Sequence, residues 1–299
     1  MNDSRLKKNP LGYWEIVDKP SSKELQDYYA KKYYQEGKGS YELEYSEQEL
    51  AYFNAKLEQR WAVLQRCLKS SKNERRFLDV GCGEGYALAF FRKLGWVVKG
   101  FDFSSAGVES KNLNCLDALV TGDIFQLLEN EINDNKQYDV IWLQNVLEHV
   151  LDPLHLLRSL KKLVAPNGFL VMTVPNDFSV AQQAALLLNH IDSQFWVAPP
   201  DHLSYFDHSS LRNIAESTNW ECVEMLGDFP IDWFLFHSNS NYVRNKSTGK
   251  TAHIARVEIE NMIHGMPLED VINFWSAAAK LGLGRDITAF LRNTGAEIV

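Results

Sequence analysis

The fold of this 299-residue chain is decided by the stretch Phe77-Leu78-Asp79-Val80-Gly81-Cys82-Gly83-Glu84-Gly85-Tyr86. Its apolar beginning, Phe77–Val80, predicts a buried strand, and residues 87–94 after it predict a helix. The glycines between them let the backbone turn tightly and approach a ligand closely, and the free N–H groups at the start of a helix favour polar ligand groups. We therefore expect a strand, a glycine-rich turn and a helix that together form a ligand site.

The spacing of these glycines distinguishes two kinds of ligand. The dinucleotide-binding pattern G-x-G-x-x-G would place its last glycine at position 86, where this chain has Tyr86. Because a bulky residue at this position disfavours the close approach of a pyrophosphate, the turn argues against an NAD-dependent oxidoreductase.

Strand-like and helix-like segments alternate around this turn, from residue 76 to residue 237. Apolar runs such as Val140–Leu143 and Phe169–Met172 predict strands that are buried on both faces, as in a parallel sheet. Strands that alternate with helices indicate βαβ units, so we predict an α/β fold with a doubly wound, Rossmann-like, mostly parallel sheet. The candidate strands are Phe77–Val80, Trp96–Asp102, Ala118–Asp123, Tyr138–Gln144 and Phe169–Val174.

Two further strand candidates follow near the end of this region. Cys222–Leu226 and Trp233–Phe236 are separated only by residues 227–232. Because a parallel return needs a long crossover, this short connection predicts an antiparallel hairpin at the edge of the sheet.

The composition excludes several classes of protein. The chain has 31 Lys and Arg against 39 Asp and Glu, a net charge of −8, which argues against binding to nucleic acid or to an anionic membrane surface. Its cysteines form no C-x-x-C pair, which fits a reducing compartment better than a disulfide scaffold. The N-terminus lacks the apolar region of a secretory signal, and no apolar run approaches the roughly 18 residues of a membrane span. We therefore expect a soluble, cytoplasmic protein.

Two carboxylates follow the next strands after the turn. Asp102 ends the strand 96–102, where a carboxylate can accept two hydrogen bonds from a ribose diol. Asp123 follows the next strand and can accept a hydrogen bond from an adenine amino group, with Ile124 or Phe125 packed on the ring. Each would be an ordinary loop residue by itself, and the order of the two after successive strands favours a ligand role.

These motifs, in this order, resemble those of the class I S-adenosylmethionine-dependent methyltransferases. The resemblance extends over residues 75–237. Within this family, the sequence is most similar to the ubiquinone-methyltransferase-like branch. Its motifs are specific for the cofactor and much less specific for the methyl acceptor. They are Leu78-Asp79-Val80-Gly81-Cys82-Gly83-Glu84-Gly85, Gly100-Phe101-Asp102, Gly122-Asp123 and Tyr138-Asp139-Val140-Ile141-Trp142-Leu143-Gln144-Asn145-Val146-Leu147-Glu148-His149-Val150.

The resemblance implies that S-adenosylmethionine is the cofactor and S-adenosylhomocysteine the product. In this family a segment before the first strand often covers the cofactor, and its aromatic side chains face the sulfonium, so one of Tyr33, Tyr34 and Tyr41 is expected to touch it. The implied contacts are Asp79, Gly81, Gly83 and Gly85 for the methionine part, Asp102 for the ribose with Phe103 after it, Asp123 and Ile124 for the adenine, Gln144 or Asn145 near the sulfonium, and Tyr33 and Tyr34 from the covering segment.

Two histidines are the candidate catalytic residues. A hydroxyl acceptor usually needs a general base, whereas a neutral amine does not. His149 follows the fourth strand, close to the expected methyl group, and His202 lies in the segment that often forms the acceptor pocket in similar methyltransferases. Alternatively, His149 orients the start of a helix and His202 caps a turn. The remaining histidines show no metal-ligand spacing, so no metal site is predicted.

Other side chains leave alternatives open. Trp142, Trp196, Phe195 and Phe206 could form an apolar acceptor wall, although aromatic residues at strand ends usually belong to the core. Arg285 is expected in a surface salt bridge, with an anionic substrate or a second subunit as its alternative partners.

The resemblance also organises the chain into three regions. Residues 1–75 are expected to form a helical N-terminal lid, residues 76–237 the cofactor-binding core with an acceptor-pocket insertion at 175–219, and residues 238–299 a C-terminal helical extension. The expected reaction is methyl transfer to oxygen or nitrogen of a small molecule, favoured as a sugar or glycan precursor. A quinone or lipid acceptor and a non-catalytic, cofactor-binding regulatory module remain as alternatives. The sequence does not predict the oligomeric state.

Overall fold

The computed structural model describes residues 3–25, 27–28, 44–68 and 74–295 of the chain. Within these residues, seven strands form the central sheet in the order β5-β4-β3-β6-β7-β10-β9. The strands up to β7 pair in parallel, and β10 is antiparallel to both β7 and β9, which confirms the predicted mostly parallel α/β sheet. The bounds are β3 (Arg76–Val80), β4 (Val97–Asp102), β5 (Leu119–Thr121), β6 (Tyr138–Gln144), β7 (Val164–Pro175), β9 (Glu221–Leu226) and β10 (Asp286–Arg292).

Both faces of this sheet are apolar because successive side chains of a strand point to opposite sides. On β6, Val140 and Trp142 belong to one hydrophobic cluster, whereas Ile141 and Leu143 belong to the other. Burial on both faces requires helices on both faces, as the apolar runs in the sequence predict.

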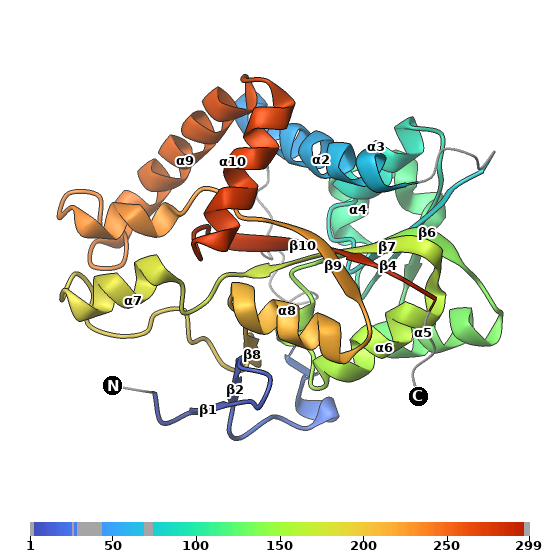
Figure 1. Cartoon of the computed structure of the whole chain (residues 1–299), viewed down its shortest axis with the longest axis horizontal. Helices are drawn as coiled ribbons and strands as arrows, with labels where there is room; N and C mark the ends of the chain where they lie inside the picture. Colours follow the sequence, from blue (N-terminus) through green and yellow to red (C-terminus); the bar gives the residue numbers. More distant parts are fainter. Residues whose placement is uncertain (1–2, 26, 29–43, 69–73, 296–299) are drawn as a thin grey trace.

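Helices cover the two faces of the sheet (Figure 1). One layer contributes to the cluster of Val140 and Trp142, and the opposite layer to the cluster of Ile141 and Leu143. The first layer contains α2 (Glu47–Cys67), α3 (Tyr86–Lys93) and α10 (Leu268–Lys280), with α4 (Ala106–Lys111) and the 3-10 helix η1 (Leu113–Ala118) near β4; the second contains α5 (Ile124–Asn133), α6 (Pro153–Leu163) and α8 (His208–Ser217). A further helix, α9 (Gly249–His264), packs against α2.

The antiparallel edge of the sheet contains different residues from those predicted. Cys222–Leu226 lies within β9 as expected, but its partner is β10, and Trp233–Phe236 belongs to the 3-10 helix η3 (Ile231–Phe236). The expected second strand is therefore wrong. The physical reason is burial: β10 is covered on both faces, with Phe290 fully buried, whereas Trp233 is 49% and Phe236 36% exposed.

The segment after residue 237 consequently contributes to the sheet as well as adding helices. It contains the 3-10 helix η4 (Lys246–Thr248), then α9 and α10, and finally β10. The two long helices thus form an insertion between neighbouring strands β9 and β10, which brings them next to the carboxyl ends of the parallel strands.

The N-terminal region is less helical than predicted. Its first elements are β1 (Leu6–Lys8) and β2 (Trp14–Ile16), which form a small sheet with β8 (Ser204–Tyr205). The Trp14 ring stacks on Phe178, 5.4 Å away and just before α7 (Val180–Leu187), so long-range packing stabilises these short strands. Helical residues follow: Ser21 forms a capping box with Glu24 at the start of residues 22–25, and α2 has a second capping box at Ser46.

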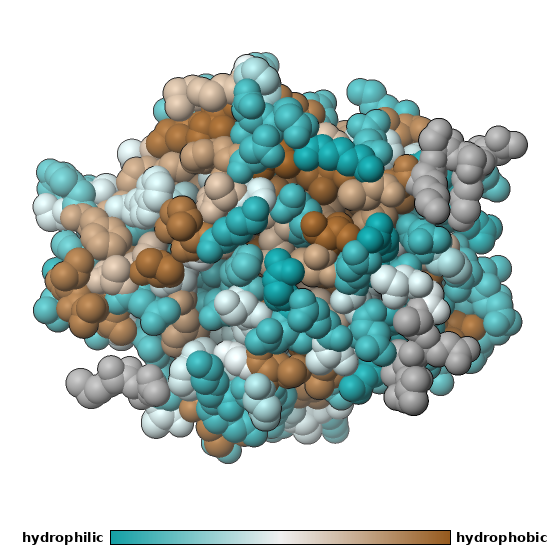
Figure 2. Space-filling model, viewed as in Figure 1, coloured by the Kyte–Doolittle hydropathy of each residue, from teal (hydrophilic) through white to brown (hydrophobic). Residues whose placement is uncertain are grey.

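The surface is mixed in character. Hydrophilic side chains cover much of the face in Figure 2, and hydrophobic side chains gather near α7, where Leu187 and Leu188 are exposed. Within the described ranges, no helix has both the length and the apolar character that crossing a membrane requires.

Candidate active site

A cavity of about 1320 Å³ opens at the carboxyl ends of the parallel strands. Residues that follow β3, β4, β5 and β6 line it, together with the end of β7 and the start of β10. Ligands of open α/β sheets bind at this edge, and the volume exceeds the roughly 300–1,000 Å³ of a typical small-molecule site. The cavity therefore has room for two ligands side by side.

The glycine-rich turn forms one wall of this cavity. Gly81, Gly83 and Gly85 have φ values of 75°, 53° and 77°, a region that other residues rarely adopt. A methyl group on Gly81 would also collide with the side chain of Val146. The backbone N–H groups of Gly81 and Cys82 donate to the carbonyl oxygen of Phe101 at 2.8 and 3.0 Å, which ties the turn to β4.

Two acidic residues lie on either side of the turn. Asp102 accepts hydrogen bonds from the backbone N–H groups of Gly83 (2.8 Å) and Ser104 (3.1 Å). Asp79 is buried on the cavity wall, where burial and the charge of Asp102 raise the pKa of its carboxyl group to about 8. Burial also raises the pKa of Asp102. Among the described residues no cation forms an ion pair with either carboxyl group, so this wall suits a ligand with an ammonium and a diol.

The third predicted acidic residue lies further along the same edge. Asp123 caps α5 by accepting the backbone N–H of Gln126 at 3.0 Å. Ile124, Phe125 and Phe103 line the cavity beside it. This end of the cavity thus combines an acidic group with apolar side chains, which suits a flat ring that has an amino group.

Gln144 and Asn145 lie at the end of β6, in the middle of the edge, and are exposed to the cavity. The Gln144 side-chain oxygen accepts a hydrogen bond of 2.7 Å from Arg60. Arg60 is buried on α2, with its guanidinium 5.5 Å from the centre of the Trp142 ring, and it also lines the cavity. Sequence reasoning missed Arg60, although it lies at helical spacing with the apolar Leu57 and Leu64, where a charged residue is unusual.

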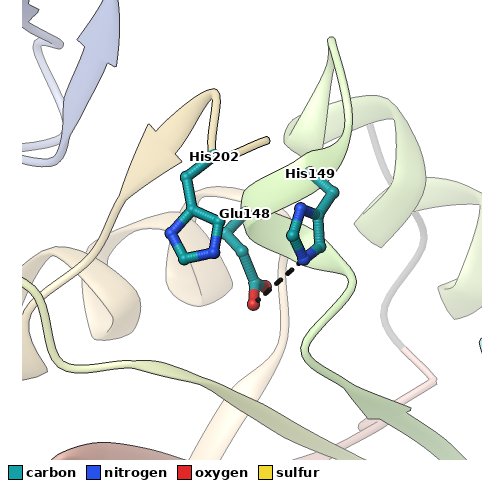
Figure 3. Close-up of side chains that lie close together, drawn as sticks. All are labelled: Glu148, His149 and His202. Carbon is teal, nitrogen blue, oxygen red and sulfur yellow. Dashed lines mark ion pairs between the residues drawn. The ribbon is translucent and has the colours of Figure 1, made fainter. Parts of the chain in front are cut away.

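The two candidate catalytic histidines come together, as Figure 3 shows. The rings of His149 and His202 are 4.9 Å apart, and both line the cavity. His149 Nδ1 lies 2.7 Å from the carbonyl oxygen of Asp201, so it carries the proton and donates. In the neutral ring, Nε2 then has the lone pair, and this atom lies 3.7 Å from Glu148 Oε1. His202 Nδ1 lies 3.8 Å from Asp177 Oδ2.

Glu148 is a further group of this cluster. It is 1% exposed, and neither of its carboxyl oxygens has a hydrogen-bond partner among the described residues. Burial raises the pKa of Glu148 well above its ordinary value, and the charges of Asp177 and Asp286 add to this effect. Both effects disfavour the charged form of Glu148, which lies beside the rings of His149 and His202.

The same three side chains have a geometry that could hold a divalent metal ion. One ligand atom each of Glu148, His149 and His202 lie within 4.8 Å of one another. Sequence spacing could not reveal this set, because His202 comes from a distant segment. Imidazole nitrogens and a carboxylate are common ligands of transition metals.

The acceptor end differs from the predicted apolar wall. Trp142 lines the cavity, but Trp196 and Phe206 are buried in hydrophobic clusters, and Phe195 packs against one of them. Arg285, expected in a surface salt bridge, instead lines the cavity and pairs with the buried Asp177 at 3.2 Å. The cavity lining combines apolar residues such as Val150, Leu151 and Pro175 with charged and polar side chains, which include Lys56, His149, Asp201, His202, Arg256, Arg285 and Asp286.

Two predicted cofactor contacts cannot be placed, since Tyr33 and Tyr34, like Tyr41, lie outside the described residues. Sequence reasoning also missed the contributions of α2, α9 and β10 to the cavity. No short motif marks them, because they reach it only through the packing of segments far apart in the chain.

Comparisons with known proteins agree with this site. The family described as "Methyltransferase domain" matches residues 50–225. The chain is 30% identical over 151 residues to a ubiquinone biosynthesis O-methyltransferase of Proteus mirabilis, covering 46% of this chain and 62% of that protein. It is 24% identical over 159 residues to the protein of the same name from Shewanella sp. (strain ANA-3), covering 51% of this chain and 66% of that protein. The matches thus span just under two thirds of these two relatives.

A solved structure is also similar along most of the chain. It is described as a SAM-dependent methyltransferase from Archaeoglobus fulgidus, with a TM-score of 0.48 and 18% sequence identity. The alignment covers 89% of this chain and 99% of that one.

Proposed function

The chain belongs to the class I S-adenosylmethionine-dependent methyltransferases, and we propose that it methylates an oxygen or nitrogen atom of a small polar acceptor, a sugar or glycan precursor. The observation that carries the acceptor class is the charged lining of the cavity beyond Gln144. Sugars offer many hydroxyl groups to such a wall, whereas a quinone or lipid tail would need an apolar one.

Within this proposal the cofactor occupies the cavity from Asp123 to Gln144. Asp79 takes the ammonium group, and Asp102 takes the ribose hydroxyls. Asp123 and Ile124 take the adenine, with Phe103 beside it, while Gly81, Gly83, Gly85 and Asn145 approach through their backbone. Arg60 takes the carboxylate, because it is a buried cation on the cavity wall without a carboxylate partner among the described residues. Bound S-adenosylmethionine supplies an electrophilic methyl group on a sulfonium, which leaves as a neutral thioether.

His149 and His202 are proposed to orient and deprotonate the acceptor. The lone pair of His149 Nε2 can accept the proton of a hydroxyl group as its oxygen forms the new bond to carbon. Glu148 Oε1 lies 3.7 Å from His149 Nε2, and Asp177 Oδ2 lies 3.8 Å from His202 Nδ1, so a carboxyl group lies beside each ring. Positioning of the two reactants supplies the remaining acceleration, since in-line displacement depends on their alignment.

Several parts of the chain would enclose the acceptor. We propose that the segment before β3 acts as the lid and residues 175–219, which include His202, as one wall of the acceptor pocket. The names of the similar proteins, ubiquinone biosynthesis O-methyltransferases, support a quinone-type molecule as the alternative acceptor.

One experiment tests the proposal at both levels. Purified protein is titrated with S-adenosylhomocysteine and with NAD, and then assayed for S-adenosylhomocysteine release with a panel of nucleotide sugars and with a catechol. We expect binding of S-adenosylhomocysteine but not NAD, and turnover with a sugar. Turnover with the catechol alone would overturn the acceptor class, and binding of NAD alone would overturn the methyltransferase assignment. Cofactor binding without turnover of any acceptor would favour a regulatory module.

A further inference from the structure

Four cationic side chains from three separate segments converge on the acceptor end of the cavity. Lys56 and Arg60 come from α2, Arg256 from α9, and Arg285 from the turn before β10. Their common position is a property of the tertiary fold, since α9 and the turn belong to the insertion between β9 and β10.

Two of these cations, Lys56 and Arg285, pair with carboxylates that do not line the cavity. Lys56 Nζ lies 3.1 Å from Asp228 and 3.4 Å from Glu260, and Arg285 lies 3.2 Å from Asp177. None of these three carboxylates lines the cavity. The carboxylates therefore fix the cations in place while the cavity itself faces the positive charges.

Arg256 is held without a carboxylate. Its guanidinium lies 5.4 Å from the centre of the Tyr52 ring, and one of its nitrogens lies 3.2 Å from His253 Nδ1. Its Nε atom is buried and has no hydrogen-bond partner among the described residues. Arg256 as a whole is half-buried and lines the cavity, so an anionic ligand can satisfy this unpaired donor.

Asp286 is a carboxylate of the cavity lining whose charge acts on these cations. Asp286 lies at the start of β10, opposite Pro175 at the end of β7, and its backbone N–H donates to Asp228 at 2.8 Å. Burial and the charge of Asp228 raise the pKa of Asp286 to about 6, while Arg285, Lys56 and Arg256 lower it. Asp286 is thus the nearest internal competitor for an anion at these cations.

We propose that Lys56, Arg256 and Arg285 form a subsite for an anionic oxygen group of the acceptor, a phosphate or a carboxylate. Arg60 lies beside Gln144 and is assigned to the cofactor, which leaves the other three cations for the acceptor. The inference rests on the proposed function and deepens it: the acceptor is an acidic or phosphorylated sugar rather than a neutral one. Paired guanidinium groups recognise such oxygens through directed hydrogen bonds.

The test measures anion binding to protein that is saturated with S-adenosylhomocysteine, so that Arg60 is occupied. Inorganic pyrophosphate and uridine diphosphate probe phosphate, glucuronate probes carboxylate, and titration calorimetry gives the affinity. We expect at least one of these probes to bind. Arg256→Gln should weaken its binding about tenfold, Arg256→Lys should weaken it less, and Asp286→Asn should strengthen it.

Lys250→Gln provides the matched control, because Lys250 lies on the same helix but is exposed and does not line the cavity. It should leave anion binding unchanged. The affinity for S-adenosylhomocysteine should stay constant in all variants, which also shows that they fold. Normal binding of S-adenosylhomocysteine without binding of any probe, or equal probe affinity in Arg256→Gln and wild type, would overturn the subsite alone. If the wild-type protein does not bind S-adenosylhomocysteine, the proposed function is overturned as well.

Discussion

At the scale of single residues, Asp79 links burial to ligand binding. Its carboxyl group has a pKa raised to about 8 by burial and by Asp102, so it is mostly protonated in the empty cavity at neutral pH. An ammonium group needs the ionised form, and binding must therefore expel the proton.

This linkage predicts that S-adenosylhomocysteine binds more tightly as the pH rises. A bound ammonium lowers the pKa of Asp79, so the affinity should rise up to about tenfold per pH unit between about pH 6 and about pH 8, and then level off. Calorimetric titrations over this range measure it. The Asp79→Asn variant should bind S-adenosylhomocysteine weakly, and its affinity should not rise with pH in this way. An equal pH dependence in the variant would show that another group titrates.

Gly81 shows why a turn residue can be irreplaceable. Its φ of 75° disfavours any side chain, and a Cβ would collide with Val146. Gly95 has a similar φ of 82°, but no atom lies within 4 Å of a Cβ built there. A substitution at Gly95 therefore introduces the backbone strain without a collision.

We expect Gly81→Ala to weaken S-adenosylhomocysteine binding by more than about tenfold and to destabilise the protein by about 1–3 kcal/mol. Gly95→Ala should lose only the stability that the backbone strain costs, and its affinity for S-adenosylhomocysteine should be normal. Thermal melting and calorimetry compare the two variants. Equal loss of binding in both would contradict a specific role for the turn.

His149 and His202 are predicted to act on the acceptor rather than the cofactor. His149→Ala and His202→Ala should keep the affinity for S-adenosylhomocysteine, while at least one lowers turnover about a hundredfold or more with the sugar that reacts in the panel. His155→Ala is the control, since His155 lines the cavity but stacks on Phe125 near the proposed adenine end. Near-normal turnover in both catalytic variants would leave positioning as the source of the rate.

At the scale of elements, β10 is the largest departure from the prediction. It joins the sheet between β7 and β9, and its start supplies Arg285 and Asp286 to the cavity region. Asp228 accepts the backbone N–H groups of both residues at 2.7 and 2.8 Å and pairs with Lys56 of α2. One carboxylate thus connects the start of the strand to the helix from outside the cavity.

The placement of β10 predicts different costs for two phenylalanine substitutions. Phe290→Ala removes a fully buried side chain from β10 and should cost about 3–5 kcal/mol of unfolding free energy. Phe236→Ala, in η3 and 36% exposed, should cost much less. Urea denaturation measures both. A larger cost at Phe236 would favour the hairpin that the sequence suggested.

At the scale of the whole molecule, the cavity joins segments from most of the chain. Residues from α2, four parallel strands, the segment around His202 and the β9–β10 insertion all line it. A ligand that contacts so many segments binds the folded state only, and it should therefore stabilise the whole protein.

We predict that saturating S-adenosylhomocysteine, at about a hundred times its dissociation constant, adds about 2.7 kcal/mol of stability and raises the melting temperature by about 4 °C. Removal of the ligand by dialysis should reverse the shift. Differential scanning calorimetry measures it, and NAD at the same concentration serves as the control. An equal shift with NAD would contradict the choice of cofactor.

Sequence alone determined the features that depend on neighbouring residues. The glycine turn needs positive φ values, Asp102 and Asp123 follow successive strands, and the apolar runs require burial on both faces; each can be read from a few adjacent positions. This was enough for the parallel part of the sheet and for the family, and it pointed to candidate cofactor residues that line the cavity. Only the tertiary structure decided which strand pairs with β9 and which cations meet at the acceptor end. Both result from packing between segments far apart in the chain, because buried contact and charge pairing depend on position in space and leave no local pattern.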